Sequence, residues 1–311
     1  MSNLLPLVQT AAELGLISGL TVLALFLSYS MLGVCDLSTD GCFTLGASVG
    51  AAVALSGHPA LSIAAAMLAG MVSGCVTGLL QTKMGINSLL SGIVVNTALY
   101  SVNIAVMGGS SLLNLNRAET VFTKAAALLT GTGLAGMQKL CVGLAAVLLT
   151  GCLLALFLRT RLGLAIRASG DNPDMVKSSS IDPAKTTVIG LCLSGSVTAL
   201  SGCLLAQAQK SVNIEIGSGM VTVALASLLI GSTFFGKRRR IPLRIFGAVL
   251  GAVLFRLVYT AALRFNLPAF MLKLVSAVIV VLAISLPYLK AQMPLVKRRL
   301  LRKKEAKNAQ T

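Results

Sequence analysis

Residues Arg167–Lys185 read RASGDNPDMVKSSSIDPAK, a polar segment between two long apolar runs. Asn172 and Pro173 form a helix start, because a capping amide is followed by a proline at the first helical position, where its missing N–H costs nothing. Asp182 and Pro183 repeat this arrangement further along the segment. The two starts predict a short helix between them and a long helix after the second, within an all-α chain.

The overall composition places this segment in a membrane protein. Hydrophobic residues make up 56% of the chain and charged residues 11%, and the mean hydropathy is +0.88. The net charge of +17 would fit a nucleic-acid partner on a soluble protein. Here the basic residues lie between or after apolar runs, which is typical of topological signals in a bilayer. We therefore expect the lipid bilayer, and no nucleic acid, as the partner of this charge.

A helix needs about 20 apolar residues to cross a bilayer, and the sequence contains about nine candidate runs. The second and seventh are short, so we expect some spans to be broken or re-entrant, and Ala125–Leu134 is a partial tenth. The predicted fold is a polytopic integral membrane helical bundle of about nine transmembrane segments, eight to ten in all. The runs are Gly15–Val34, Phe43–Leu55, Leu61–Leu80, Leu89–Met107, Leu140–Leu158, Thr187–Ala206, Val221–Phe235, Ile245–Leu263 and Met271–Leu289.

The distribution of basic residues predicts the orientation. If nine spans alternate, most of the 26 lysines and arginines fall on one side, in segments 159–185, 237–244 and 290–311. Basic loops stay in the cytoplasm. We therefore expect the N-terminus outside, the C-terminus in the cytoplasm, and the polar segment 159–187 on the cytoplasmic face. The first apolar run lacks a preceding basic region, so we expect it to be retained as a span.

The sequence offers no pattern typical of an enzyme, a metal site or a cofactor site. The seven cysteines lie mostly within apolar runs, without a CxxC pair, and the chain has one histidine. The stretch GSTFFGKR at 231–238 resembles a phosphate-binding loop, but Arg238 stands where Ser or Thr must ligate Mg²⁺. No Ser-His-Asp set or HExxH motif is present. We expect no metal, no catalytic residues and no cofactor bound by this chain.

Five polar or charged residues in or beside the spans are candidates for a polar path. Asp36 and Asp40 lie at the junction of the first two spans, where a charge must be hydrated or paired. They either line the path or act locally, as a cap and a turn former respectively. Asn96 and Asn103 share one helical face, where they either line the path or bond between helices. Arg256 lies within a span, which favours a pairing or pore role.

Pairs of glycines recur at helical spacing along the spans. Such pairs let helix backbones approach closely in lipid, so they predict a compact bundle. They are Gly15 with Gly19, Gly46 with Gly50, Gly70 with Gly74 and Gly78, and Gly247 with Gly251.

Three blocks of the chain resemble permease subunits of bacterial ABC importers, in the branched-chain amino acid and ribose permease superfamily. Gly163–Gly202 is similar to the family's cytoplasmic loop, of the form R-A-x-G-x-N-P-x-x-A, and to the following span with its LSG motif. Val176 replaces the alanine of that form. Gly33–Leu55 resembles the stretch that joins the first two spans, and Gly219–Pro287 resembles the closing part.

The resemblance implies that Pro173–Ser179 is a coupling helix, which docks on a separate ATP-binding cassette ATPase. Met175 and Val176 are then its apolar contacts. The implied chain has a transmembrane permease domain at 1–289, with a cytoplasmic coupling loop at 159–187, and a basic cytoplasmic tail at 290–311. The residues expected to carry the coupling are Arg167, Gly170, Asp171, Asn172, Pro173, Asp174, Met175 and Val176.

The resemblance also implies partners, cargo and location. ATP is used by the partner ATPase, and an extracytoplasmic substrate-binding protein or lipoprotein delivers the cargo. The membrane unit is a homodimer or a pair with a close permease homologue, in the bacterial cytoplasmic (inner) membrane. The cargo is a small polar solute, with an amino acid favoured. The alternative is an ion-coupled secondary transporter, which would use ionisable residues within the spans.

Overall fold

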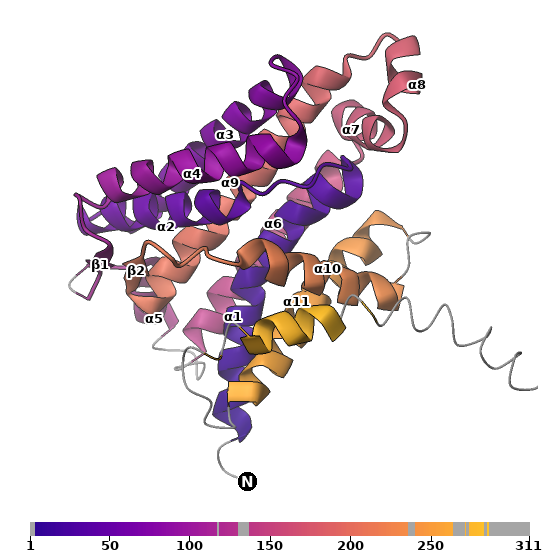
Figure 1. Cartoon of the computed structure of the whole chain (residues 1–311). Coiled ribbons are helices and arrows are strands. Elements are labelled where there is room, and N and C mark those ends of the chain that lie inside the picture. The colour runs from indigo at the N-terminus through magenta and orange to yellow at the C-terminus, as the bar shows by residue number, and fades with distance from the viewer. Residues whose placement is uncertain are drawn as a thin grey trace, which may run out of the picture.

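The computed structural model describes residues 4–116, 118–129, 137–235, 240–263, 271, 274–282 and 285. This part of the chain is mostly helical (Figure 1). The helices are α1 (Leu4–Leu25), the π-helical segment η1 (Phe26–Met31), α2 (Thr39–Leu55), α3 (Pro59–Thr82), α4 (Ser88–Val106), α5 (Val121–Leu129), α6 (Gln138–Phe157), α7 (Arg161–Asp171), α8 (Pro173–Ser178), α9 (Pro183–Gln209), α10 (Met220–Phe235) and α11 (Ile241–Leu263).

Six helices of the described part are long and apolar enough to cross a membrane: α1 with η1, α3, α4, α6, α9 and α11. Each matches one of the predicted apolar runs. The predicted short runs, the second and the seventh, form the shorter helices α2 and α10. The ninth run, 271–289, is described only in part, and residues 274–282 of it are helical. The polytopic helical class is confirmed, while the number of nine crossings stays a prediction.

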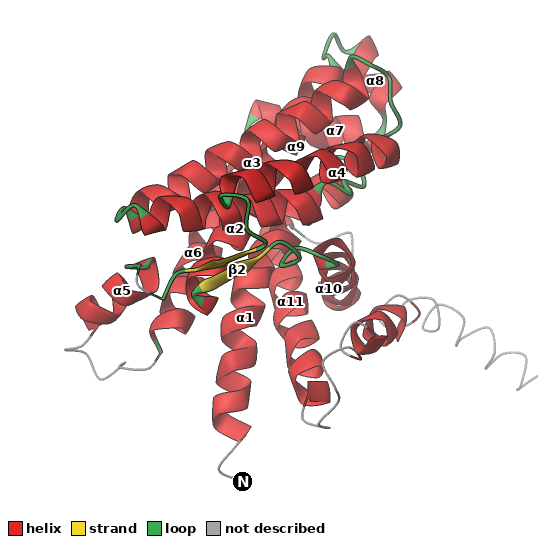
Figure 2. Ribbon diagram, turned by 60° about the vertical axis from the view of Figure 1, so that its left-hand side comes forward, coloured by secondary structure: helices red, strands yellow, loops and turns green. Residues whose placement is uncertain are grey.

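The helices form two groups that meet along α1 and α9. In one group α9 packs against α2 and α3, and α4 covers α2. In the other, α1 packs against α6, α10 and α11. Figure 2 shows α1 and α11 projecting below the layer of α2, α3, α4 and α9. Because α9 also contacts α1, this helix ties the two groups together.

Small residues allow the close packing of α9, as the glycine spacing predicts. A side chain at Gly46 of α2 would collide with the backbone of Ala199 in α9. Gly70 of α3 and Gly195 of α9 face each other in the same manner. Without side chains at these positions, the backbones come into direct contact, which is the usual basis of helix association in lipid.

Two short strands, which were not predicted, accompany the helices. Strand β1 (Leu112–Asn114) pairs antiparallel with β2 (Ser211–Asn213), with Leu113 opposite Val212. The ladder joins the loop after α4 to the end of α9. Three residues are too few to give a readable alternation of polar and apolar positions, so the sequence did not predict these strands.

Candidate functional site

The polar segment 159–187 forms two helices where one was predicted. The predicted short helix is α8, and its N-cap is Asn172, whose Oδ1 accepts from the N–H groups of Asp174 and Met175 at 3.1 Å each. Pro173 lies at the first helical position. Asp182 caps α9 by accepting from the Ala184 N–H at 2.9 Å. Both predicted helix starts are therefore present.

The additional helix, α7, begins at a cap that the sequence analysis missed. The Thr160 hydroxyl accepts from the Gly163 N–H at 3.3 Å, and the helix runs to Asp171. Asn172 then serves as the C-cap of α7 and the N-cap of α8 at once. A threonine before a periodic apolar pattern is a readable helix start, so Thr160 was the signal.

Burial separates the two predicted apolar contacts of α8. Met175 is 60% exposed, whereas Val176 is 1% exposed, inside the chain. Val176 therefore cannot be a contact for a partner protein, and this part of the prediction is corrected: it fastens α8 to its own chain. The reason is the helical period, which points adjacent residues in directions about 100° apart. Asp174 pairs with Lys177 at 3.8 Å, with both side chains exposed, so this pair adds little stability.

Helix α7 is anchored to the body of the bundle through its last turn. The hydroxyls of Ser169 and Thr186 in α9 lie 2.8 Å apart in a buried hydrogen bond. A side chain at Gly170 would collide with the carbonyl of Met31 at the end of η1. Gly33, with φ +73°, lies in the same turn and faces the Gly170 carbonyl. The α7–α8 pair is thus held against α9 and η1 together.

Arg244 of α11 secures the same junction. Its guanidinium donates to the Ser30 hydroxyl at 2.7 Å and lies over the ring of Phe26, 5.3 Å from the centroid. Arg167 and Asp171 of α7 are close enough to interact electrostatically with this guanidinium. A π-helical segment within a helix often marks a functional site. Here it is the place where α7, α11 and α1 meet.

A polar cavity of about 470 Å³ brings together three of the five predicted path residues, Asp40, Asn96 and Asn103. It lies between α2, α4 and the turn after β2, which contributes Glu215 and Ser218. The Asn103 amide donates to the Gly41 carbonyl at 3.2 Å. Its Oδ1 is buried without a partner, so it is free to accept a hydrogen bond.

Asp40 also caps the start of α10. Its carboxylate accepts from the Gly219 N–H at 2.9 Å and from the Val221 N–H at 2.8 Å. These amides lie at the N-terminus of α10, where a negative charge also interacts favourably with the helix dipole. Asp40 therefore fixes α10 to α2 across the cavity, which goes beyond the local turn considered from sequence.

Asp36 does not line this cavity. It is 3% exposed, and its carboxylate accepts from the Ser38 N–H at 2.8 Å and from the Ser38 hydroxyl at 2.6 Å. Thr77 of α3 in turn donates to the Ser38 hydroxyl at 3.2 Å. These contacts order the turn before α2, so Asp36 acts locally, although the N-cap of α2 is Ser38 and not Asp36.

Arg256 lines a different cavity, of about 550 Å³. Its guanidinium lies over the Tyr259 ring, 5.4 Å from the centroid, and its buried Nε has no hydrogen-bond partner. Ser218 lines this cavity and the cavity of Asp40 alike. The turn at 214–219 therefore stands between the two cavities, with predicted path residues on either side of it.

The comparisons with known proteins identify the family of the chain. A family model described as "Branched-chain amino acid transport system / permease component" matches residues 8–284. The chain belongs to this permease family. It is 32% identical over 267 residues, 86% of either chain, to a tyrosine transport system permease protein of Clostridioides difficile.

Two further relatives of the permease transport other cargo, according to their names. The ribose import permease protein RbsC of Escherichia coli strain K12 is 25% identical, over 80% of this chain and 75% of its own. A probable branched-chain amino acid transport permease, LivH, of Methanocaldococcus jannaschii is 28% identical over 71% and 62%. No solved structure matches the permease significantly. The family and the six apolar helices indicate a multi-pass protein of the inner membrane.

The cavity wall at 214–219 is a further part of the permease that the sequence analysis missed. Its signal was present in SVNIEIGSG at 211–219, a polar, glycine-containing stretch between two apolar runs. Within the described ranges, no three His, Cys, Asp or Glu side chains gather as a metal site. Gly231 of the phosphate-loop-like stretch lies inside α10, and residues 236–238 of that stretch are outside the described part.

Proposed function

We propose that this permease forms the translocation path of an ABC importer for a small polar solute, and that a separate ATPase drives it through α7 and α8. One observation carries the proposal. Helix α9 follows α8 after the four residues 179–182 and leads through β2 into the turn that lines the polar cavity. A single rigid helix thus connects the exposed lever to the cavity wall, so movement at one end changes the other.

The lever consists of the exposed part of α8 and its fixed base. Met175 is the exposed apolar side chain on α8, and such a residue is a suitable anchor in a partner's groove. Val176 and the Asn172 cap hold α8 in shape, while Ser169 and Gly170 hold α7 to α9 and η1. Movement of Met175 by a bound partner therefore moves α9 and η1 as well, because α7 and α8 are held to them.

The cavity supplies groups that suit a polar solute. The amides of Asn96 and Asn103 line it, and the Asn103 Oδ1, which is buried in the cavity wall, is an acceptor without a partner. We favour an amino acid as the cargo, because the tyrosine permease relative is 32% identical and the ribose permease relative 25%. Binding specificity resides mainly in an extracytoplasmic receptor, whose ligands can be screened directly. A receptor selective for pentoses would overturn the choice of an amino acid.

Two permease chains and two ATPase subunits form the complete importer. Each ATPase subunit needs one docking surface, and this chain offers one α7–α8 pair. The second chain is another copy or a close homologue. The mass of the detergent-solubilised complex tests this arrangement, and full transport by one permease with one ATPase would refute it.

The cavity is tested by ATP-driven uptake in proteoliposomes that contain the permease, its ATPase and its receptor. Asn103→Leu removes the amide at similar volume, so uptake should fall while the ATPase is still retained. The control is Val102→Leu, an exposed position on the same helix that does not line the cavity. Uptake by Asn103→Leu equal to that of the control would show that the solute takes another route.

An ion-coupled secondary transporter is the competing function. Membership of a family of transport-system permease components speaks against it. Uptake without ATP, driven by a proton or sodium gradient alone, would support it and refute our proposal.

A further inference from the structure

A third cavity is an open groove between α1, α6 and α11. It holds about 650 Å³. Leu16, Leu148 and Phe246 are among its lining residues, and Leu148 is 63% and Phe246 56% exposed. Such large apolar side chains at an open surface require an apolar occupant.

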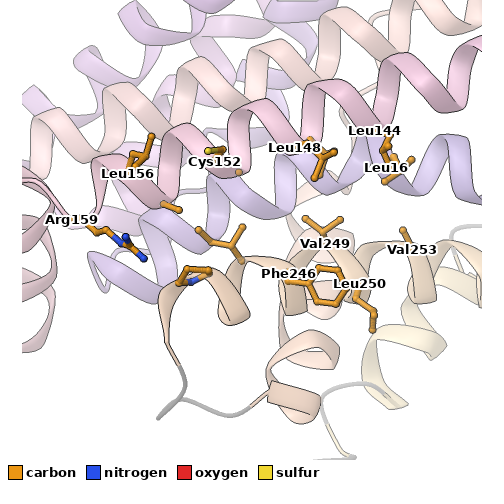
Figure 3. Close-up of a pocket in the computed structure, with 15 residues that line it drawn as sticks. Leu16, Leu144, Leu148, Cys152, Leu156, Arg159, Phe246, Val249, Leu250 and Val253 are labelled. Atoms are coloured by element: carbon orange, nitrogen blue, oxygen red, sulfur yellow. The ribbon is translucent and has the colours of Figure 1, made fainter.

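One end of this groove is charged. Figure 3 shows Arg159 at one end of the row of apolar side chains and Val253 toward the other. In the part of the chain that the structure describes, the ion pairs join Lys124 to Glu119 and Lys177 to Asp174, and neither involves Arg159. Arg159 also lies on the side that the charge distribution assigns to the cytoplasm.

The groove is longer than the hydrocarbon depth of one lipid leaflet. It extends from Leu144 of α6 to Arg159, two residues beyond the end of this helix, about 22 Å at 1.5 Å per residue. One leaflet contributes half of the ~30 Å hydrocarbon core, or about 15 Å. An acyl chain that begins at Arg159 therefore fits within the groove along its full length.

We propose that the groove binds an anionic phospholipid, with an acyl chain along α6 and α11 and the phosphate against Arg159. Basic pockets at the cytoplasmic end of transmembrane helices suit such headgroups. The exposure of α6 also supports a lipid. Only 22% of its most apolar stretch is buried within the chain, and the mean hydropathy of that stretch is 2.6. A second copy of this chain is a poor match for Arg159, since it carries 9 acidic against 26 basic residues.

The test uses the full-length permease in nanodiscs of phosphatidylglycerol and phosphatidylcholine, with retained lipids counted by native mass spectrometry. Wild type should retain phosphatidylglycerol in preference. Arg159→Gln should lower this preference about fivefold, the effect of one basic residue near an anionic surface. Cys152→Phe, which fills the groove, should displace both lipids.

Two control variants outside the groove distinguish specific lipid binding in the groove from a general effect of charge or size at the surface. Arg161→Gln removes a nearby exposed charge that does not line the groove, and Leu153→Phe enlarges another face of α6. Both should behave as wild type, and inorganic phosphate should not compete with the lipid. Equal losses for Arg161→Gln and Arg159→Gln would overturn the proposal. A change of oligomeric mass in Cys152→Phe with unchanged lipid would overturn it too, and would assign the groove to a second copy.

Discussion

Adjacent residues of α8 should respond in opposite ways to truncation. Met175→Ala is expected to weaken binding of the ATPase without loosening the helix. Val176→Ala is expected to loosen the helix, because its side chain is 1% exposed and packs within the chain, whereas Met175 is 60% exposed. The pair thus separates contact with the partner from support of the lever.

The magnitudes follow from burial. Val→Ala removes two buried methyl groups at about 0.8 kcal/mol each, and the cavity left behind raises the cost to about 2 kcal/mol. Since 1.4 kcal/mol is a factor of ten, local opening of α8 should increase about 25-fold. Met175→Ala changes local stability by less than about 0.5 kcal/mol. If Met175 is the anchor of the interface, its loss costs at least about 2 kcal/mol of binding, or about 25-fold in affinity.

Two assays report the two effects independently. Hydrogen exchange at Ser179 and Ile181 measures opening of α8, because these amides donate to the carbonyl of Val176 at 3.1 and 3.2 Å. Titration of the detergent-solubilised permease with its ATPase measures binding. The control is Ser178→Ala, an exposed position on the same helix.

One outcome would refute the reasoning. If Met175→Ala binds the ATPase as wild type does, the exposed face of α8 is not the docking surface, and α8 is only a connector. If Val176→Ala leaves exchange at Ser179 and Ile181 unchanged, its burial does not hold the helix in place.

Three further predictions concern packing, capping and orientation. Gly46→Ala should lower stability by about 1–3 kcal/mol in thermal unfolding, because the added Cβ would collide with the backbone of Ala199. The control Gly143→Ala adds a Cβ at ordinary contact distance and should be near neutral, so equal unfolding temperatures of the two variants would contradict the prediction. Asp40→Ala should lower the free energy of unfolding by about 1–3 kcal/mol for each amide left unpaired at the start of α10. Asp40→Asn should lower it less, because one acceptor oxygen remains, and the reverse order of stability would contradict the role of Asp40 as a cap. A reporter fused after Lys185 should be active only in the cytoplasm, and external activity would refute the predicted orientation.

The sequence did not predict which face of α8 is buried. Both Met175 and Val176 are apolar, and hydropathy alone gave them the same role. Six residues are too few for a helical period to show which face of α8 meets the bundle. The direction of burial was decided by the packing of α7 and α9 around it.

The two aspartates show the same limit. Asp36 bonds to Ser38, within two residues, and its local interpretation was available from sequence. Asp40 bonds to the amides of Gly219 and Val221, which lie on another helix far along the chain. No pattern of spacing around Asp40 contains that information, because the partners meet only once α2 and α10 are packed.

The sequence by itself determined the membrane class, the apolar helices and the two helix starts of the segment at 159–187. These features are local: hydropathy adds up along one helix, and a cap bonds within three residues of its own position. Only the tertiary structure decided that Asn96, Asn103 and Asp40 share one cavity, that Arg256 lies in another, and that an apolar groove ends at Arg159. Each of these depends on contacts between distant segments, whose close approach is set by side-chain packing between helices and leaves no period in the sequence.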